Sequence, residues 1–549
     1  NALGAATIGL KNIAIGQQAM SGVTTGQADD NIAIGRSALV GAAGTTGNNN
    51  VAIGLQAMDA LTTGLDNVAI GRNALGAATT GCENVAIGQL ALGAGVTTGK
   101  WNIAIGESSM TSLTTGCQNV AIGELALGTA TTTCQSIGIG DQALGGGVMT
   151  GRDNIGIGYQ AGQVISSGYN NVILGKNAGD AVTTGFINVA IGQNALGTST
   201  TGCYNVAIGP AALGGAVTTG ISNIALGTNT MDALTTGSNN IAMGSNALGA
   251  ATIANCNVAI GFGAMSGVTT NHSHLNIAIG AGTMAGNANS EAEQNIALGR
   301  YAMDAITTGN CNVAMGTNAL GALTTGCDNV AIGQLALGQG TLGGTTAQGN
   351  CNVAIGKDAL RDSTIGSFNI AIGKSPMQGA VTGIDNIAIG RNSADALLAG
   401  HSNIAIGKDA YGAATIGIKN IMIGCNVANG ITTGQADENI AIGTYALTGN
   451  ANTTGNRNIA IGYAAFDAIT TGTCNIAVGT NALGEATTGS KNIALGQFAL
   501  GCAALTGADN IGIGEAAGAD IISGACNVAI GYAALANATD NCDNVAIGR

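Results

Sequence analysis

Hydrophobic residues recur in one short pattern, Asn-(Ile/Val)-Ala-Ile-Gly, which is repeated 31 times along the 549 residues. In the commonest copy, residues 67–83, the stretch Val68–Ile70 is β-branched at both ends and alternates with period two. That alternation predicts a short strand. Gly71 follows the strand, and glycine accepts a positive φ at no steric cost. Ala74-Leu75 is a second, shorter apolar piece that predicts a second short strand, and Thr79-Thr80-Gly81 predicts a second turn.

Successive copies begin 17 residues apart in most cases, with spacings of 18 or 19 and one of 23. A short fixed period predicts a solenoid, in which each repeat is one supersecondary unit stacked on the next. A helix is a poor interpretation, because 93 glycines at fixed places would break each turn of it. We therefore predict an all-β fold, a parallel β-solenoid (β-roll) of about 31 short coils, forming a single continuous array over residues 1–549.

The asparagine that opens each copy predicts a ladder along one edge of the stack. Only Ser136 replaces it. Parallel strands stacked in register lie about 4.8 Å apart. Side-chain amides repeated at that distance form hydrogen bonds from one coil to the next. The expected ladder includes Asn12, Asn31, Asn67, Asn84, Asn102 and Asn119.

The two faces of the strand suggest an oligomer. The middle strand position is alanine in 26 of the 31 copies, where a solvent-facing position would drift to polar residues. We expect the large residues, such as Ile70, Ile87 and Ile105, to fill the coil with Leu75 opposite. The small face would then meet a neighbouring subunit, because one thin coil cannot cover both faces. Three such faces around an axis predict a homotrimer, with an oligomer face of Ala69, Ala86, Ala104 and Ala121.

Composition narrows the possible functions. The net charge is −13 and aromatic residues make up 3 %, which argues against nucleic-acid binding, because phosphate contacts need clustered Lys and Arg. There is no run of 18 apolar residues, so no membrane span is expected. No Ser/His/Asp or Cys/His set recurs, and there is no phosphate loop. His272 and His274 alone are too few ligands for a metal. We expect no enzyme activity, no cofactor and no metal.

Thirteen cysteines are many for an acidic rod, and eleven lie one or two residues before the repeat asparagine. Cys117 and Cys134 occupy the same position in adjacent coils, which places their Cα atoms about 5 Å apart and within disulfide range. Disulfides within or between chains, and reduced buried thiols, are both compatible with this pattern. Metal binding is the weakest of the three, because Cys-x-x-Cys pairs are missing. The expected disulfide edge comprises Cys117, Cys134, Cys311, Cys327, Cys351, Cys526 and Cys542.

The text Asn-Val-Ala-Ile-Gly-x-x-Ala-Leu…Thr-Thr-Gly resembles the repeat region of viral and phage tail-fibre proteins, most closely at residues 171–192 and at Gly462-Tyr463-Ala464-Ala465. It also resembles the head repeats of trimeric autotransporter adhesins, whose Val-Ala-Ile-Gly motif lies on a left-handed parallel β-roll. The 17-residue period and the Thr-Thr-Gly turn favour the fibre. The resemblance covers the whole chain and implies a left-handed, trimeric solenoid that is extracellular, as a virion fibre or a cell-surface appendage.

Two functions follow from the resemblance. The first is a structural shaft that holds or forms an attachment surface. The second is an adhesin head whose flank binds host cells or matrix. Expected partners are other copies of the chain and a host receptor or matrix, reached through a tip or a flank. Joining Arg549 to Asn1 restores the repeat with a spacing of 17, so we also expect this sequence to be a window of a longer fibre, or a unit that continues end to end.

Overall fold

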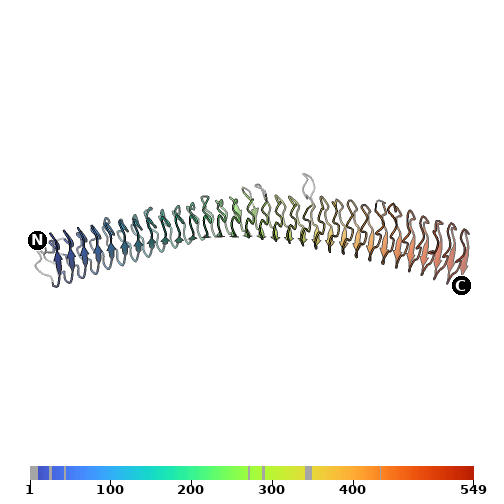
Figure 1. Ribbon diagram of the computed structural model, residues 1–549, viewed down its shortest axis with the longest axis horizontal. Coiled ribbons are helices and arrows are strands. Elements are labelled where there is room, and N and C mark those ends of the chain that lie inside the picture. The colour runs from blue at the N-terminus through green and yellow to red at the C-terminus, as the bar shows by residue number, and fades with distance from the viewer. Residues whose placement is uncertain are drawn as a thin grey trace. The chain divides into compact units, whose positions relative to one another are not determined.

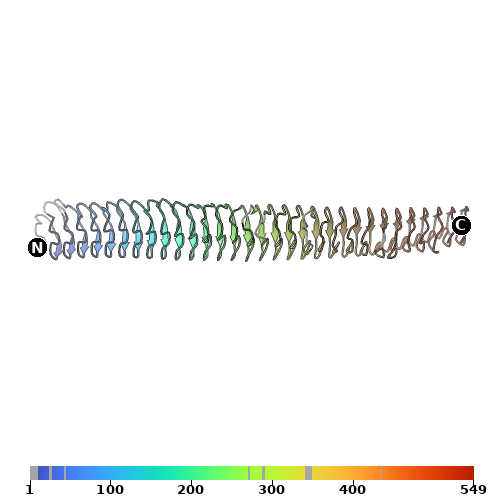
Figure 2. The same ribbon diagram turned by 90° about the horizontal axis from the view of Figure 1, so that it is seen from above.

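The computed structural model describes residues 10–23, 28–41, 45–269, 273–286, 291–339, 349–432 and 435–549. It divides into two compact units, Asn1–Ser273 and His274–Arg549, which share one type of coil and are treated separately. In each unit, short strands lie side by side on one side of the stack and turns lie on the other (Figures 1 and 2).

The strands of the first unit are β1 (Ile13–Ile15), β2 (Ile32–Ile34), β3 (Val51–Ile53), β4 (Val68–Ile70), β5 (Val85–Ile87), β6 (Ile103–Ile105), β7 (Val120–Ile122), β8 (Ile137–Ile139), β9 (Ile155–Ile157), β10 (Val172–Leu174), β11 (Val189–Ile191), β12 (Val206–Ile208), β13 (Ile224–Leu226), β14 (Ile241–Met243), β15 (Ala254–Asn255) and β16 (Val258–Ile260). The two-residue strand β17 (Ser273–His274) lies at the boundary.

The strands of the second unit are β18 (Ile277–Ile279), β19 (Ile296–Leu298), β20 (Val313–Met315), β21 (Val330–Ile332), β22 (Val353–Ile355), β23 (Ile370–Ile372), β24 (Ile387–Ile389), β25 (Ile404–Ile406), β26 (Ile421–Ile423), β27 (Ile440–Ile442), β28 (Ile459–Ile461), β29 (Ile476–Val478), β30 (Ile493–Leu495), β31 (Ile511–Ile513), β32 (Val528–Ile530) and β33 (Val545–Ile547).

Within each unit, neighbouring three-residue strands pair in parallel and in register from one coil to the next. In the first unit, Ala69 of β4 pairs with Ala86 of β5; in the second, Ala388 of β24 pairs with Ala405 of β25. The predicted all-β parallel solenoid, with one strand of this kind for each sequence repeat, is therefore confirmed within each unit. The second apolar piece, Ala74-Leu75, forms a turn where a strand was predicted.

The coil reverses direction through a turn with unusual backbone angles. Gly71, directly after β4, has a φ of 136°, and a Cβ there would lie 2.5 Å from the Gly88 carbonyl oxygen of the next coil. Asn73 and Leu75 then adopt left-handed conformations with φ of 55° and 49°. Left-handed backbone in a residue with a large side chain is uncommon and costs energy. Here it aims the Leu75 side chain into the coil, where it is buried.

The strand faces are the reverse of the prediction. Ala69, Ala86, Ala104 and Ala121 are completely buried inside the coil, whereas Ile70 on the outside is 37 % exposed. The proposed oligomer face is therefore wrong, and so is the expectation that Ile70, Ile87 and Ile105 fill the interior. The physical reason is the thinness of the coil. Leu75, as predicted, lies inside, and a strand backbone this close to a leucine leaves room only for a methyl group on the inner face.

The exceptions to alanine show how closely the interior is packed. At Gly156, an added Cβ would lie 2.7 Å from Cγ of Leu144 in the preceding coil. At the next strand the large residue is instead Ile173, and both turn positions facing it are glycines, Gly162 and Gly179. A Cβ on either would lie 3.0 Å or 2.8 Å from Cδ1 of Ile173. The inner strand residue and the turn residue are thus matched in volume, as expected of a close-packed core.

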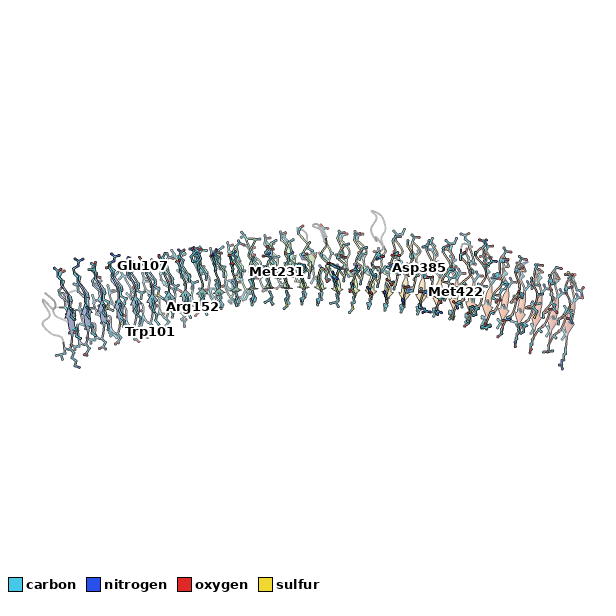
Figure 3. All side chains as sticks on the ribbon, in the orientation of Figure 1. Trp101, Glu107, Arg152, Met231, Asp385 and Met422 are labelled. Atoms are coloured by element: carbon cyan, nitrogen blue, oxygen red, sulfur yellow. The ribbon has the colours of Figure 1, made fainter. Side chains whose placement is uncertain are left out.

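Large side chains lie both in the coil interior and on the surface. Met231 and Met422, in separate units, are completely buried, whereas Trp101 is 48 % exposed (Figure 3). No helix in the described residues combines the length and the apolar character needed to cross a membrane.

Candidate functional site: the strand face and the turn edge

The repeat asparagines form a hydrogen-bonded ladder within each unit. The predicted ladder is confirmed for its buried members Asn31, Asn67, Asn84, Asn102 and Asn119. Asn12, at the start of the described ladder, is half-buried. Oδ1 of Asn67 accepts two hydrogen bonds from Asn84, one from its backbone N–H at 3.0 Å and one from Nδ2 at 3.1 Å. The second Nδ2 hydrogen of Asn84 is donated to the Gly99 carbonyl oxygen at 3.0 Å. At this step both Nδ2 hydrogens of Asn84 and both lone pairs of Asn67 Oδ1 are used, as favoured for buried polar groups.

The ladder is weaker where Ser136 replaces asparagine. The Ser136 backbone N–H still donates to Asn119 Oδ1 at 3.0 Å, and the Asn154 N–H donates to Ser136 Oγ at 3.3 Å. Thr133 Oγ1 donates to the Gly151 carbonyl oxygen, a role that the amide takes elsewhere. The second bond of a ladder step, from the side-chain amide Nδ2 to the preceding residue, is missing both from Ser136 to Asn119 and from Asn154 to Ser136. These two steps therefore hold one ladder bond each, where the step from Asn67 to Asn84 holds two.

The outer side of the strands, here called the strand face, is entirely aliphatic. It consists of the first and third residues of the 31 three-residue strands, and each of these is Val, Ile, Leu or Met. Most are half-buried or exposed; Ile103 is 38 % and Met243 is 40 % exposed. Parallel sheets are normally covered on both faces, and an apolar surface that continues from coil to coil within each unit is typical of an interaction site.

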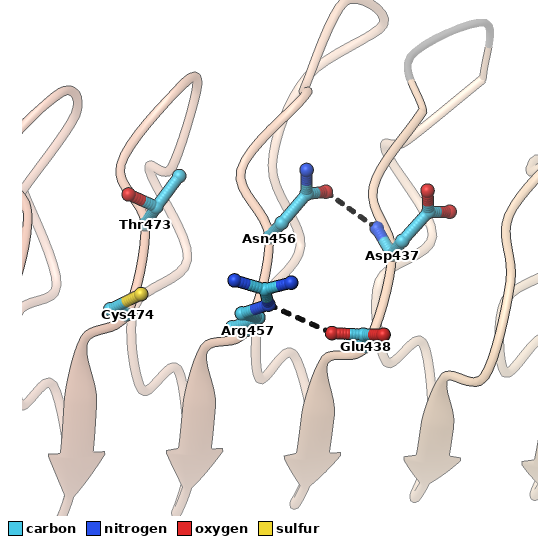
Figure 4. Close-up of a pocket in the computed structure, with 6 residues that line it drawn as sticks. All are labelled: Asp437, Glu438, Asn456, Arg457, Thr473 and Cys474. Carbon is cyan, nitrogen blue, oxygen red and sulfur yellow. Dashed lines mark hydrogen bonds and ion pairs between the residues drawn. The ribbon is translucent and has the colours of Figure 1, made fainter.

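The turn edge is the second candidate surface; it comprises the two residues before each ladder position. Residues at the same position in successive coils interact along it. In the second unit, Arg457 Nε donates to Glu438 Oε2 at 2.8 Å (Figure 4). Lys419 Nζ lies 4.0 Å from the same carboxylate. Hydrogen bonding to Arg457 lowers the pKa of Glu438. Such exposed pairs contribute little to stability, so this column is a solvated edge.

A depression of about 330 Å³ opens beside this ion pair (Figure 4). Asp437 donates its backbone N–H to Asn456 Oδ1 at 2.7 Å across it, and Cys474 lies in the following coil. The lining residues do not include a nucleophile held by a base, so the depression offers no catalytic arrangement.

Aromatic side chains gather at one place on the turn edge of the first unit. The rings of Tyr169 and Phe186 are stacked with centroids 4.9 Å apart, and Phe186 meets Tyr204 edge to face at 5.3 Å. Tyr169 and Tyr204 are 38 % and 50 % exposed. Arg152 and Tyr169 line a shallow pocket of about 260 Å³ next to the stack. In a chain with 14 aromatic residues, such a cluster is a local concentration of binding surface.

Among the cysteines predicted to form disulfides, the structure brings one pair into contact. Cys117 Sγ and Cys134 Sγ lie 2.7 Å apart, and the two residues form a parallel bridge. The pKa of Cys117 is raised, first by its hydrogen bond to Cys134 and then by burial. The other predicted cysteines are not aligned: Cys311, Cys351 and Cys526 directly precede a ladder asparagine, whereas Cys327 and Cys542 lie one residue earlier. All thirteen cysteines are free thiols.

A third recurrent feature lies in the turn, nine residues after the ladder asparagine. Six coils carry a partly buried aspartate there, and each is followed by a coil with glycine at the same position. A Cβ on Gly76 would lie 3.4 Å from Oδ1 of Asp59, and a Cβ on Gly412 would lie 3.3 Å from Oδ1 of Asp395. Desolvation by burial raises the pKa of all six carboxyls, Asp59, Asp180, Asp232, Asp304, Asp395 and Asp467.

Within the described part of the chain, no group of three or more His, Cys, Asp or Glu residues could hold a metal ion. His272 lies outside the described residues. A scan against models of protein families and a search among curated proteins both found no match to this chain.

Sequence reasoning did not identify the strand face or the aromatic cluster. The sequence did contain a signal for the strand face. Ile173 replaces the usual alanine where the turn residues Gly162 and Gly179 are small, which indicates that the middle strand residue faces the interior. The sequence signal for the cluster is three aromatic residues in successive coils, with Tyr169 and Phe186 two residues before a ladder asparagine and Tyr204 one residue before the next.

Proposed function

We propose that the chain is a non-enzymatic structural fibre protein, assembled as a homotrimer through the strand face and located outside the cell or on a virion. The observation that carries the proposal is the aliphatic strand face described above. It shows the same two side chains coil after coil, so a partner must repeat with the same rise to cover it. Another parallel copy of this chain meets that requirement at every coil.

Physical chemistry supports burial of this face. Its residues are β-branched or aliphatic and have no polar group to interact with water, so covering them releases about 25 cal/mol for each Å² of apolar surface. Three narrow, flat strips close around a common axis, which agrees with the trimer and the left-handed coil that the sequence resemblance implies. A bundle of three parallel solenoids would resist bending, as a shaft requires.

Mass measurement in solution tests the trimer. We expect a particle of about three times 53.0 kDa for the parent chain. Replacing Ile87 with Arg should weaken assembly, because it places a charge in the proposed interface while leaving the coil interior intact. Gln118→Arg adds the same charge on the exposed turn edge and should leave the mass unchanged. A stable monomer of the parent chain, or equal effects of the two variants, would contradict the assignment.

The aromatic cluster favours a second candidate function, in which the flank itself binds a host surface as adhesin heads do. Exposed tyrosines beside an arginine are typical of binding sites. If the flank binds, Tyr169→Ala or Tyr204→Ala should reduce attachment to cells or to immobilised matrix at least about tenfold, the effect of losing one anchor residue. Tyr301→Ala, an exposed tyrosine outside the cluster, is the matched control. Equal attachment by all variants would leave the shaft function alone.

A further inference from the structure

We propose that Cys117 and Cys134 are a disulfide-forming site that joins two adjacent coils at one of the two ladder steps weakened by Ser136. Cys117 lies two residues before Asn119, and Cys134 lies two residues before Ser136. The step joined by the two cysteines is thus the one at which the serine removes the side-chain bond to Asn119. This inference concerns a single chain and is independent of the proposed trimer.

The geometry of the pair is suitable for a bond. The two residues form a parallel bridge, the Cys117 N–H donates to Cys134 Sγ at 3.2 Å, and the sulfurs lie 2.7 Å apart. A disulfide requires a sulfur–sulfur distance of about 2.05 Å and Cα atoms about 4.4–6.8 Å apart. Neighbouring parallel strands are about 4.8 Å apart, so the bond needs only a small side-chain movement. Both thiols are half-buried and accessible to a small reagent.

Two basic residues flank the pair along the turn edge. Lys100 and Arg152 occupy the same turn-edge position in the coils before Cys117 and after Cys134. The Gln118 N–H donates to the Lys100 carbonyl oxygen, and the Asp153 N–H donates to the Cys134 carbonyl oxygen, which keeps the four coils in register. The hydrogen bond to Cys134 and burial raise the pKa of Cys117 by more than Lys100 lowers it, so the thiolate that attacks disulfides forms at alkaline pH.

The remaining cysteines provide an internal comparison. Cys526 and Cys542 are also in adjacent coils, but they are offset by one residue relative to the ladder. Cys542 Sγ accepts a hydrogen bond from the Ala525 N–H at 3.4 Å, so the residue aligned with it is an alanine. Two cysteines in adjacent coils are therefore not brought together unless they lie at the same distance from the ladder asparagine.

The reaction needs a disulfide oxidant, for which oxidised glutathione is a suitable reagent. One cysteine thiolate attacks a sulfur of glutathione disulfide, forms a mixed disulfide and releases one glutathione thiolate. The second cysteine thiolate then attacks the protein sulfur of the mixed disulfide and releases the second glutathione. Two electrons pass from the cysteines to the reagent, and the two thiol protons go to the released glutathiones or to solvent.

The test treats the reduced, folded full chain with oxidised glutathione, digests it without reduction and identifies linked peptides by mass spectrometry. We expect a Cys117–Cys134 link within one chain, with a mass loss of about 2 Da, while Cys526 and Cys542 remain unlinked to each other. Amide exchange across residues 119–154 should slow about tenfold or more on oxidation, because the bond suppresses local opening of the coil. Cys117→Ser should abolish both effects, and Cys526→Ser should abolish neither.

Three results would overturn the proposal: stable glutathione adducts at Cys117 or Cys134 without a link, links only between chains, or equal linking of the offset pairs. The variant Ser136→Asn distinguishes the effect of the disulfide from the effect of the missing ladder bond. It should still form the link, but with a smaller change in amide exchange, because the restored asparagine already holds that step. An unchanged exchange effect in this variant would contradict the connection with the ladder break.

Discussion

Two stretches of the asparagine ladder in the first unit differ in one residue and show which part of the ladder depends on the side chain. From Asn67 to Asn102 each step has two hydrogen bonds to the preceding Oδ1. From Asn119 through Ser136 to Asn154 each step has one, made by the backbone N–H. The coil geometry survives the substitution, so register is set by the strands and the core, and the amides add stability to a register already chosen.

The largest effect is expected from breaking the regular stretch with Asn84→Leu. The change leaves the Asn102 N–H, the Gly99 carbonyl oxygen and Asn67 Oδ1 short of partners in a buried site. Each unsatisfied buried group costs about 1–3 kcal/mol, so we expect local destabilisation of about 3 kcal/mol or more. Amide exchange in β5 and β6 measures it, because a solenoid can open locally. Exchange as slow as in the parent chain would show that the ladder is not needed for stability.

A smaller effect should come from exchanging the two ladder states. Asn84→Ser should destabilise its coil by about 1 kcal/mol, since one hydroxyl replaces the amide bonds, and Ser136→Asn should stabilise its coil by a similar amount. The same exchange measurement applies to both variants. If both variants stabilised the coil, or both destabilised it, the ladder side chain would not account for the difference between the two stretches. Because Thr133 already bonds to the Gly151 carbonyl oxygen, the gain at Ser136→Asn should be the smaller of the two.

The smallest effect concerns Asp59, in a coil whose ladder is intact. Burial raises the pKa of its carboxyl, so the folded state binds a proton more readily than the unfolded state. Its unfavourable contribution is present at neutral pH and is lost as the pH falls through the raised pKa towards 3.8. Asp59→Asn should therefore slow amide exchange around β3 and β4 at pH 7, and this advantage should shrink at acidic pH. An advantage independent of pH would show that the charge is not responsible.

Much of the fold was predictable from the sequence, because the repeat fixes the position and register of the strands. Asparagine at a fixed place before each strand also sufficed to predict the ladder. Which strand face lies inside was not predictable from period two alone, since alternation defines two faces without assigning them. The assignment depends on Leu75, whose left-handed backbone directs it towards the strand. A turn of that kind has no simple sequence signal.

The candidate surfaces were harder to predict for the same reason. The sequence pattern predicts the alanines at the interface and the isoleucines in the core, and the structure reverses both. The cysteine pair was predicted correctly as neighbours, because Cys117 and Cys134 share a repeat position. The disulfide edge predicted from the sequence also includes Cys311, Cys327, Cys351, Cys526 and Cys542, but neighbours among these five differ by one residue in their distance from the ladder asparagine.

The volume match around Ile173 has a consequence for how such an array changes length in evolution. Tandem repeats gain and lose copies by unequal recombination, which treats copies as interchangeable. The copies in this chain are not interchangeable, because the Ile173 side chain packs against Gly162 of the preceding coil. Deleting residues 154–170 would place Ile173 over Leu144 and crowd the interior. Viable insertions and deletions should therefore preserve compatible neighbours, so that the array is inherited in blocks of matched coils.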